Sequence, residues 1–120
     1  MPVTPGFRLF ALEQLARVVP GGEAALRARA MFGGVGVYAG DRFFALLDDD
    51  VLYLKVDDAT RPEFEAAGMR PFMPGGDPAQ TMQYYDVPAE VLEDADALRP
   101  WAALALDAAA RKSRRGPKRK

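Results

Sequence analysis

Residues 30–58, AMFGGVGVYAGDRFFALLDDDVLYLKVDD, predict three short strands joined by two tight turns. Gly40-Asp41 suits the first turn, because Gly supplies the positive φ of a tight hairpin and Asp bonds to nearby backbone. Asp48-Asp49-Asp50 forms the second break. Turns of about two or three residues are too short for a parallel crossover, so the strands pair antiparallel. The strands are expected at Val35–Ala39, Arg42–Leu47 and Val51–Val56.

Side-chain patterns within these strands predict which faces are buried. Val51–Val56 has only apolar residues on one face and a mixed set on the other, which is typical of a half-buried antiparallel strand. Residues 43–47, FFALL, are apolar throughout. The middle strand is therefore expected to be central in a sheet and covered on both faces.

A helix is predicted before the meander, beginning at Thr4-Pro5. Thr can cap free N–H groups, and Pro suits the first helical position. Pro20-Gly21-Gly22 ends the helix, and residues 23–29 fit either an extra helical turn or the approach to the sheet. The expected apolar stripe consists of Phe7, Leu9, Leu12, Leu15 and Val19.

The second half of the chain alternates short elements with a loop. Residues 61–67 predict a helix with Phe64 facing inward and Gly68 as its stop. The elements that follow are a loop at 70–80 with a brief extended piece at 69–73, a strand at 81–87 and a helical turn at 89–92.

A long helix is predicted near the C-terminus. Its apolar stripe consists of Leu98, Trp101, Leu104 and Ala108. Pro100 allows two interpretations: it opens the main helix at the first position, or it kinks a helix that Asp94 caps.

These elements predict an α+β fold. Its antiparallel β-sheet contains the meander of three strands plus one or two more, and N- and C-terminal helices flank it. A chain of 120 residues is expected to form one domain. We place this domain at residues 1–110 and a basic disordered tail at residues 111–120.

The tail concentrates positive charge. Its basic residues are Arg111, Lys112, Arg114, Arg115, Lys118, Arg119 and Lys120. Residues 1–110 have a net charge of -8, although the whole chain has only -1. Clustered Lys and Arg displace counterions from nucleic-acid phosphates, so the tail predicts weak, sequence-independent contact with DNA. The alternative is a solubilising tail, and the acidic body is not expected to bind DNA itself.

Composition narrows the chemistry that the protein can perform. The chain has no cysteine and no histidine, which removes disulfides, thiolate zinc sites and the usual general base. No apolar run approaches the roughly 18 residues of a membrane span, and no signal peptide is recognisable. We therefore expect a cytoplasmic protein without a membrane partner.

Two loop motifs have a site interpretation and a structural one. Gly33-Gly34-Val35-Gly36 has the glycines of a phosphate-binding loop, but a strand follows and the P-loop Lys is missing. Close backbone packing or a bulge is the favoured role. Asp48-Asp49-Asp50 lacks the Gly and distal Glu of a calcium loop, which favours a solvated hairpin turn.

Several aromatic and acidic residues also have a site interpretation and a structural one. Tyr53 and Tyr84-Tyr85 are candidates for stacking on bases, but alternating aromatic residues on a strand favour core and sheet surface. Asp57, Asp58 and Glu63 are candidates for acid–base chemistry, but no nucleophile lies near them, and helix capping explains the two aspartates. From the sequence we therefore expect a protein that is not an enzyme and that has no catalytic residues, no cofactor and no metal site.

Several motifs occur together in a fixed order. They are Met31–Tyr38, Phe43–Ala45, Leu52–Asp57, Phe64–Gly68, Tyr84–Pro88 and Leu92–Asp94. With these motifs the chain resembles the TfoX N-terminal domain family of TfoX/Sxy-like proteins, over roughly Thr4–Ala110. The resemblance implies one antiparallel sheet flanked by helices, and a dimer.

The resemblance also implies a function. Better-known members are bacterial regulators that activate natural-competence genes as co-activators with a cyclic-AMP-responsive transcription factor, and they have a second, C-terminal domain. This chain is expected to be a stand-alone copy of the N-terminal domain, and the resemblance transfers no catalytic residues to it.

Two functional hypotheses follow. The first is a small regulatory protein that acts through contacts with a transcription factor or RNA polymerase, with DNA affinity from the tail. The alternative is a stand-alone structural or partner-binding module, in the form of a homodimer, that holds a peptide or protein and has no transcriptional role.

Overall fold

The computed structural model describes residues 3–31, 33–72 and 83–115, with only the backbone of residues 113–115. Its helices are α1 (Pro5–Val18), the 3₁₀ helix η1 (Gly22–Ala25), α2 (Arg61–Ala66), α3 (Ala89–Leu92) and α4 (Ala95–Arg115). Its strands are β1 (Leu26–Met31), β2 (Gly34–Ala39), β3 (Arg42–Asp48), β4 (Val51–Lys55) and β5 (Tyr84–Val87). In these residues no helix combines the length and apolar character that a membrane span requires.

The five strands form one sheet in the order β1-β2-β3-β4-β5, and every neighbouring pair is antiparallel. The predicted meander is confirmed as β2, β3 and β4. One further strand lies on each side of it, so the α+β prediction is confirmed with two additional strands. The ambiguous residues 23–29 contain the end of η1 and the beginning of β1.

The pairing of β2 and β3 contains a bulge. Val37 lies opposite Ala45, but the next residue, Tyr38, lies opposite Phe43. Phe44 is therefore an extra residue on β3, and both Phe44 and Ala45 enter the hydrophobic core. As predicted, β3 is the most completely covered part of the meander, with buried side chains from Phe44 to Leu47.

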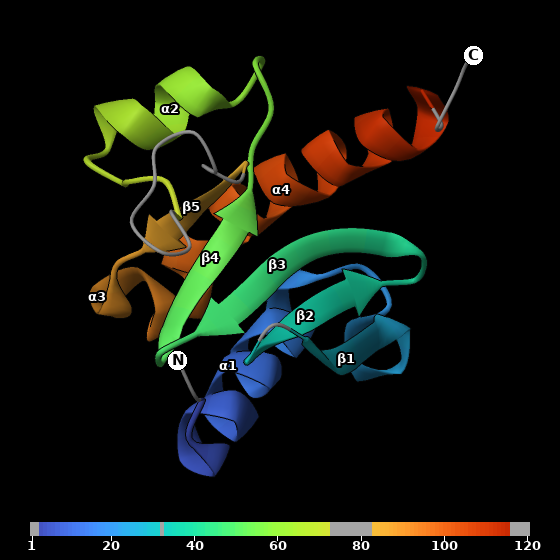
Figure 1. The fold of residues 1–120 in the computed structure, drawn as a ribbon, viewed down its shortest axis with the longest axis vertical. Helices are drawn as coiled ribbons and strands as arrows, with labels where there is room; N and C mark the ends of the chain where they lie inside the picture. The colour runs from blue at the N-terminus through green and yellow to red at the C-terminus, as the bar shows by residue number, and fades with distance from the viewer. Residues whose placement is uncertain (1–2, 32, 73–82, 116–120) are drawn as a thin grey trace.

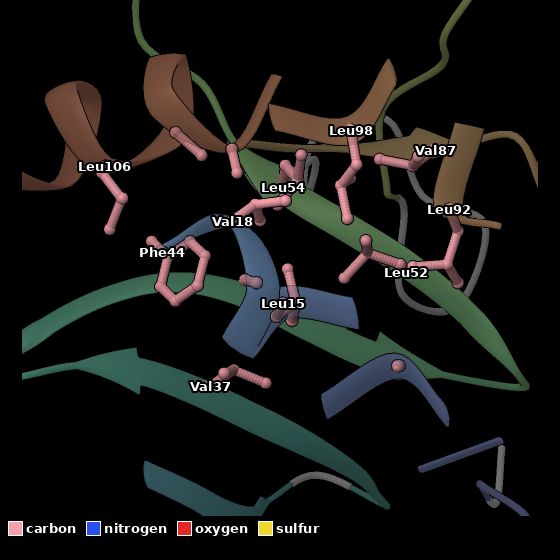
Figure 2. Close-up of a cluster of buried hydrophobic side chains, with 14 of the residues drawn as sticks. Leu15, Val18, Val37, Phe44, Leu52, Leu54, Val87, Leu92, Leu98 and Leu106 are labelled. Carbon is pink, nitrogen blue, oxygen red and sulfur yellow. The ribbon is translucent and has the colours of Figure 1, made fainter. Parts of the chain in front are cut away.

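Helices α1 and α4 lie behind the strands in Figure 1 and cover one face of the sheet. The core fills the space between them, as Figure 2 shows. Its labelled side chains come from both layers: Leu15 and Val18 of α1, Leu98 and Leu106 of α4, and Val37, Phe44, Leu52, Leu54 and Val87 of the sheet. Burying each large apolar side chain in this layer stabilises the folded state by about 1.5–3 kcal/mol relative to leaving it exposed.

The buried face of α1 differs from the predicted stripe. Leu15 and Val19 are buried, but Leu9 is 62% exposed, and Ala11 and Val18 complete the buried face instead. The small Ala11 lets α1 approach its neighbours closely, whereas Leu9 projects from another side of the helix. Apolar residues thus remain on a part of α1 that the core does not use.

Polar contacts define the helix ends. Thr4 caps α1 by accepting a hydrogen bond from the Phe7 N–H, as predicted. Asp94 caps α4: its carboxylate accepts from the N–H groups of Asp96 and Ala97 at 3.0 and 3.3 Å. Pro100 therefore lies inside α4, which decides between the two interpretations of that residue.

The outer edge of β5 is paired with a short extended segment. The Phe72 N–H donates to the Tyr84 carbonyl at 2.7 Å, and the Asp86 N–H donates to the Arg70 carbonyl at 2.8 Å. Pro71 lies between these bonds, opposite Tyr85. The expected extended piece is thus present at residues 70–72, whereas most of the predicted loop and the start of the predicted strand, residues 73–82, lie outside the described residues.

Candidate protein-binding site

Strand β1 forms the other edge of the sheet (Figure 1), and no backbone pairs with its outer side in the described residues. The Gly40 N–H donates to the Ala25 carbonyl at 2.9 Å. Hydrogen-bonded and non-bonded residue pairs alternate in an antiparallel ladder. Since Ala25 and Gly40 form a hydrogen-bonded pair, the backbone groups of Arg27 and Arg29 also bond to β2. The N–H and C=O groups of the alternate residues, Leu26, Ala28 and Ala30, consequently point away from the sheet.

A groove of about 620 Å³ lies between α1 and β1. Its apolar lining consists of Leu9, Leu12 and Ala16 from α1 and Leu26 and Ala28 from β1. Of these α1 residues the core leaves Leu9 exposed, whereas Leu12 is partly buried against the core. The small Ala28 contributes little volume to the β1 wall, so the groove stays hollow beside the open edge.

The groove and the adjacent strand carry charged side chains. Glu13, Arg17, Glu23 and Arg27 contribute to the groove lining. On β1 itself the charged residues are both arginines, Arg27 and Arg29, and both are exposed. Neither guanidinium has an ion-pair partner within the described part of the chain. The strand edge is therefore locally positive on a body that is acidic overall.

The face of the sheet away from α1 and α4 carries an aromatic row. Tyr38 stacks on Phe43 with ring centroids 4.9 Å apart, and Phe43 contacts Tyr84 at 5.4 Å. The Lys55 ammonium lies 5.0 Å from the Tyr84 ring centroid. Burial raises the pKa of the Tyr84 hydroxyl. Tyr84 is part of a packed cluster, so it does not offer a free ring for base stacking.

The other two tyrosine candidates also have structural partners. Tyr85 is buried against Phe64 and donates from its hydroxyl to Glu65 at 2.6 Å. The half-buried Tyr53 lies against Phe72 with centroids 4.7 Å apart. The prediction that these aromatic residues serve the core and the sheet surface is confirmed.

The glycine motif is explained by close packing. Gly33 adopts a φ of +80° between β1 and β2. A Cβ on Gly34 would collide with the Leu47 carbonyl oxygen, and one on Gly36 would lie 2.7 Å from the Met31 Cε. Gly34 therefore permits close backbone approach in the sheet, and Gly36 leaves room for the Met31 side chain. Close packing is the role that the sequence favoured.

The aspartate turn fastens the start of α1. Asp49 and Asp50 adopt left-handed φ values of 51° and 57° in the β3–β4 turn. The Asp50 carboxylate accepts from the Thr4 N–H at 2.8 Å and from the Thr4 hydroxyl at 2.9 Å. In the residues that the structure describes, no group of three or more Asp, Glu, His or Cys side chains is placed to hold a metal ion.

Asp57 has a partner that the sequence did not reveal. Arg111 donates to its carboxylate from Nε at 2.6 Å and from a terminal nitrogen at 3.0 Å. The backbone N–H groups of Ala59 and Thr60 also donate to it, at 3.1 and 3.2 Å. The hydrogen bond from Arg111 lowers the pKa of Asp57 to about 2. Asp57 thus joins the turn before α2 to the end of α4.

The other acid–base candidates occupy ordinary surface positions. Asp58 pairs with Arg61 at 2.6 Å, and its side chain is almost fully exposed. Glu63 lies exposed in the first turn of α2. The capping role predicted for the two aspartates is supported for Asp57, which accepts from backbone N–H groups just before α2. Asp58 instead pairs with the Arg61 side chain, and the N-cap residue of α2 is Thr60.

The predicted basic tail divides into three parts. Arg111 is committed to Asp57, and Lys112 is exposed on α4. Helix α4 continues to Arg115. The sequence predicted disorder from residue 111 onward, but residues 111–115 are helical. The backbone of Arg114 and Arg115 lies in this last turn. Lys118, Arg119 and Lys120 lie outside the described residues.

Sequence reasoning did not identify the α1–β1 groove. The alternation Leu26-Arg27-Ala28-Arg29-Ala30 is a period-two pattern that could have identified β1 as a strand with small residues on one face. The surplus of apolar residues near Leu9 on α1 was the second signal.

The sequence profile of the family described as TfoX N-terminal domain matches residues 13–109. This range extends from α1 to the last turns of α4 and includes all five strands. No curated protein matches the chain. Because the family profile covers most of the chain and the whole sheet, this protein belongs to the TfoX N-terminal domain family.

Proposed function

We propose that this domain is a non-enzymatic regulatory module that acts by binding another protein in the groove between α1 and β1. The observation that supports the proposal most strongly is the coincidence of an apolar groove with an open sheet edge. Exposed apolar surface beside unpaired backbone is a surface that a partner can cover.

Family membership suggests the kind of partner. TfoX-type regulators act as transcriptional co-activators, so the proposed partner is a transcription factor or RNA polymerase in the cytoplasm. The acidic body is poorly suited to hold DNA, and protein contact is therefore the main interaction. The basic residues beyond Arg111 add weak DNA affinity.

Two features support a role without catalysis. The chain lacks the histidine and cysteine that most often supply a general base or nucleophile. The Asp57 carboxylate, whose pKa is lowered to about 2, is held in a bidentate pair with Arg111, which leaves it unsuited to accept a proton near neutral pH.

The test uses adjacent substitutions on α1. Leu9→Glu places a charge in the groove, whereas Phe10→Glu places the same charge on the next residue, which is 38% exposed and does not line the groove. We expect Leu9→Glu to weaken capture of the purified cyclic-AMP-responsive factor or RNA polymerase at least tenfold, and Phe10→Glu to leave it nearly unchanged. Equal loss in both variants, or no capture by the wild type, would reject the proposal.

A further inference from the structure

We infer that the outer edge of β1 binds an extended segment of the partner as an added strand, with acidic side chains on one face of the segment and apolar ones on the other. The inference rests on the proposed function and specifies the shape and chemistry of what is bound. Three features of the edge support it: its backbone, its apolar side and its arginines.

The backbone of β1 is a template for strand addition. Leu26, Ala28 and Ala30 direct their N–H and C=O groups outward, and β1 contains no proline that would remove a donor. The opposite edge of the sheet is already paired at residues 70–72. Within the described residues β1 is therefore the edge at which an extended chain can add main-chain hydrogen bonds.

The helix side of the edge suits apolar side chains. An added strand would lie about 4.8 Å from β1, and every second side chain would point toward the α1 layer. That side is lined by Leu9 and Leu12, while Ala28 leaves space beside them. Burying apolar side chains there would also cover the exposed part of Leu9.

The other side of the edge suits acidic side chains. Arg27 and Arg29 alternate along β1 with Leu26 and Ala28, and this alternation directs their side chains to the face opposite α1. Arg27 also borders the groove, at the boundary between the two faces. Cross-strand neighbours on one face come within about 4.5–5.5 Å at Cβ, so carboxylates of the added strand would meet these guanidinium groups.

A second copy of this chain fits the same edge poorly. If β1 paired antiparallel with β1 of another copy, the outward residues Leu26, Ala28 and Ala30 would have to face one another. Arg27 and Arg29 would then lie opposite arginines of the second copy in the central registers. Like charges directly opposite each other destabilise a strand pair, which favours an acidic partner over a homodimer here.

The test uses a fluorescein-labelled peptide, Glu-Val-Glu-Val-Glu-Val-Glu, and a matched peptide with Lys in place of every Glu. Fluorescence anisotropy measures binding to the wild type and to the double variant Arg27→Glu/Arg29→Glu, whose two sites are exposed. We expect the wild type to prefer the Glu peptide at least tenfold and the double variant to prefer the Lys peptide. Arg99→Glu, on the exposed surface of α4, is the control and should keep the wild-type preference.

Amide hydrogen exchange provides an independent readout. Strand addition should slow exchange at Leu26, Ala28 and Ala30 when the Glu peptide binds, while the amides of Arg27 and Arg29 are protected already. Peptide preference that does not reverse with the arginines, or exchange that stays fast at the three amides, would overturn the inference. So would a stable dimer that protects these amides without peptide.

The outcomes separate this inference from the proposed function. If Leu9→Glu abolishes capture of the partner protein but the three amides stay unprotected in that complex, the groove binds a partner in another form and only the strand inference fails. If the peptide protects the amides but capture is insensitive to Leu9→Glu, the edge site remains and the regulatory proposal fails.

Discussion

Asp57 connects two parts of the molecule that are far apart in sequence. Its carboxylate accepts from the backbone N–H groups of Ala59 and Thr60 and from the side chain of Arg111, 54 positions away. The bidentate geometry favours the ionised carboxylate and so lowers its pKa to about 2 from an ordinary 3.8.

This pKa shift gives stability a defined pH dependence. The pKa of Asp57 is lower in the folded state than in the unfolded state. The stabilisation that the ionised Asp57 gives the folded state is therefore fully present above about pH 4 and disappears as the pH falls through about 2. We expect Asp57→Asn to lower the free energy of unfolding at pH 7 by about 1–2 kcal/mol, a range that allows for the partial exposure of Arg111. Urea denaturation between pH 2 and pH 7 measures this.

Asp58→Asn is the matched control, because Asp58 is the neighbouring carboxylate and forms only an exposed ion pair with Arg61. Its substitution should change the free energy of unfolding by less than about 0.5 kcal/mol at any pH. If Asp57→Asn keeps the wild-type slope between pH 4 and pH 2, the Arg111 contact does not stabilise the folded state.

At the scale of elements, α4 contains a proline in its interior, where proline normally destabilises a helix. Pro100 lies inside the helix and cannot donate to the carbonyl of Asp96, one turn earlier. Both residues are exposed, so water can hydrate that carbonyl. Close packing of the alanine-rich face of α4, at Ala102, Ala105 and Ala109, holds the helix against the sheet despite this loss.

Pro100→Ala should therefore stabilise the protein. A proline inside a helix costs about 3 kcal/mol relative to alanine, but the proline also restricts the unfolded chain by about 0.4–1 kcal/mol. We expect a net increase of about 2 kcal/mol in the free energy of unfolding, measured by urea denaturation at neutral pH. A decrease would show that the geometry around Pro100 is required for the packing of α4.

At the scale of the whole molecule, charge is divided between an acidic body and a basic end. Arg111 belongs structurally to the body because it holds Asp57. Residues 113–120 contain five of the 16 basic residues and no acidic ones, so the chain without them has a net charge of -6. A chain that ends at Lys112 tests the role of the basic end and keeps the contact between Arg111 and Asp57, whereas a chain that ends at Ala110 would lose it.

Fluorescence anisotropy on duplex DNA should show weak binding by the full chain at low salt and a steep loss at physiological salt, since the contacts are to phosphates. The chain ending at Lys112 should bind at least tenfold more weakly at low salt. Circular dichroism of the shortened chain controls for folding. Equal binding by both chains would assign DNA contact to the body and reject the tail as its source.

Local sequence patterns were sufficient for much of the fold. Turn residues with positive φ, such as Gly40, and the alternation in β4 predicted the meander with nearly the observed bounds. The helix start at Thr4-Pro5 was equally local. These features depend on backbone conformation and on interactions over a few residues, which the order of amino acids encodes directly.

Patterns that depend on neighbours distant in sequence were not resolved. Apolar residues occur on several sides of α1, so periodicity did not decide that Leu15 and Val18 face the core while Leu9 faces the groove. Whether residues 23–29 form a strand was equally open, because β1 has charged residues on one face and small ones on the other.

The sequence by itself determined the antiparallel meander, the α+β class and the family, because turn chemistry, side-chain alternation and motif order are properties of the chain alone. Only the tertiary structure decided that Arg111 pairs with Asp57 and that α1 leaves a groove beside the open edge of β1. Both features bring together residues from distant segments, and their geometry follows from how the helices pack on the sheet.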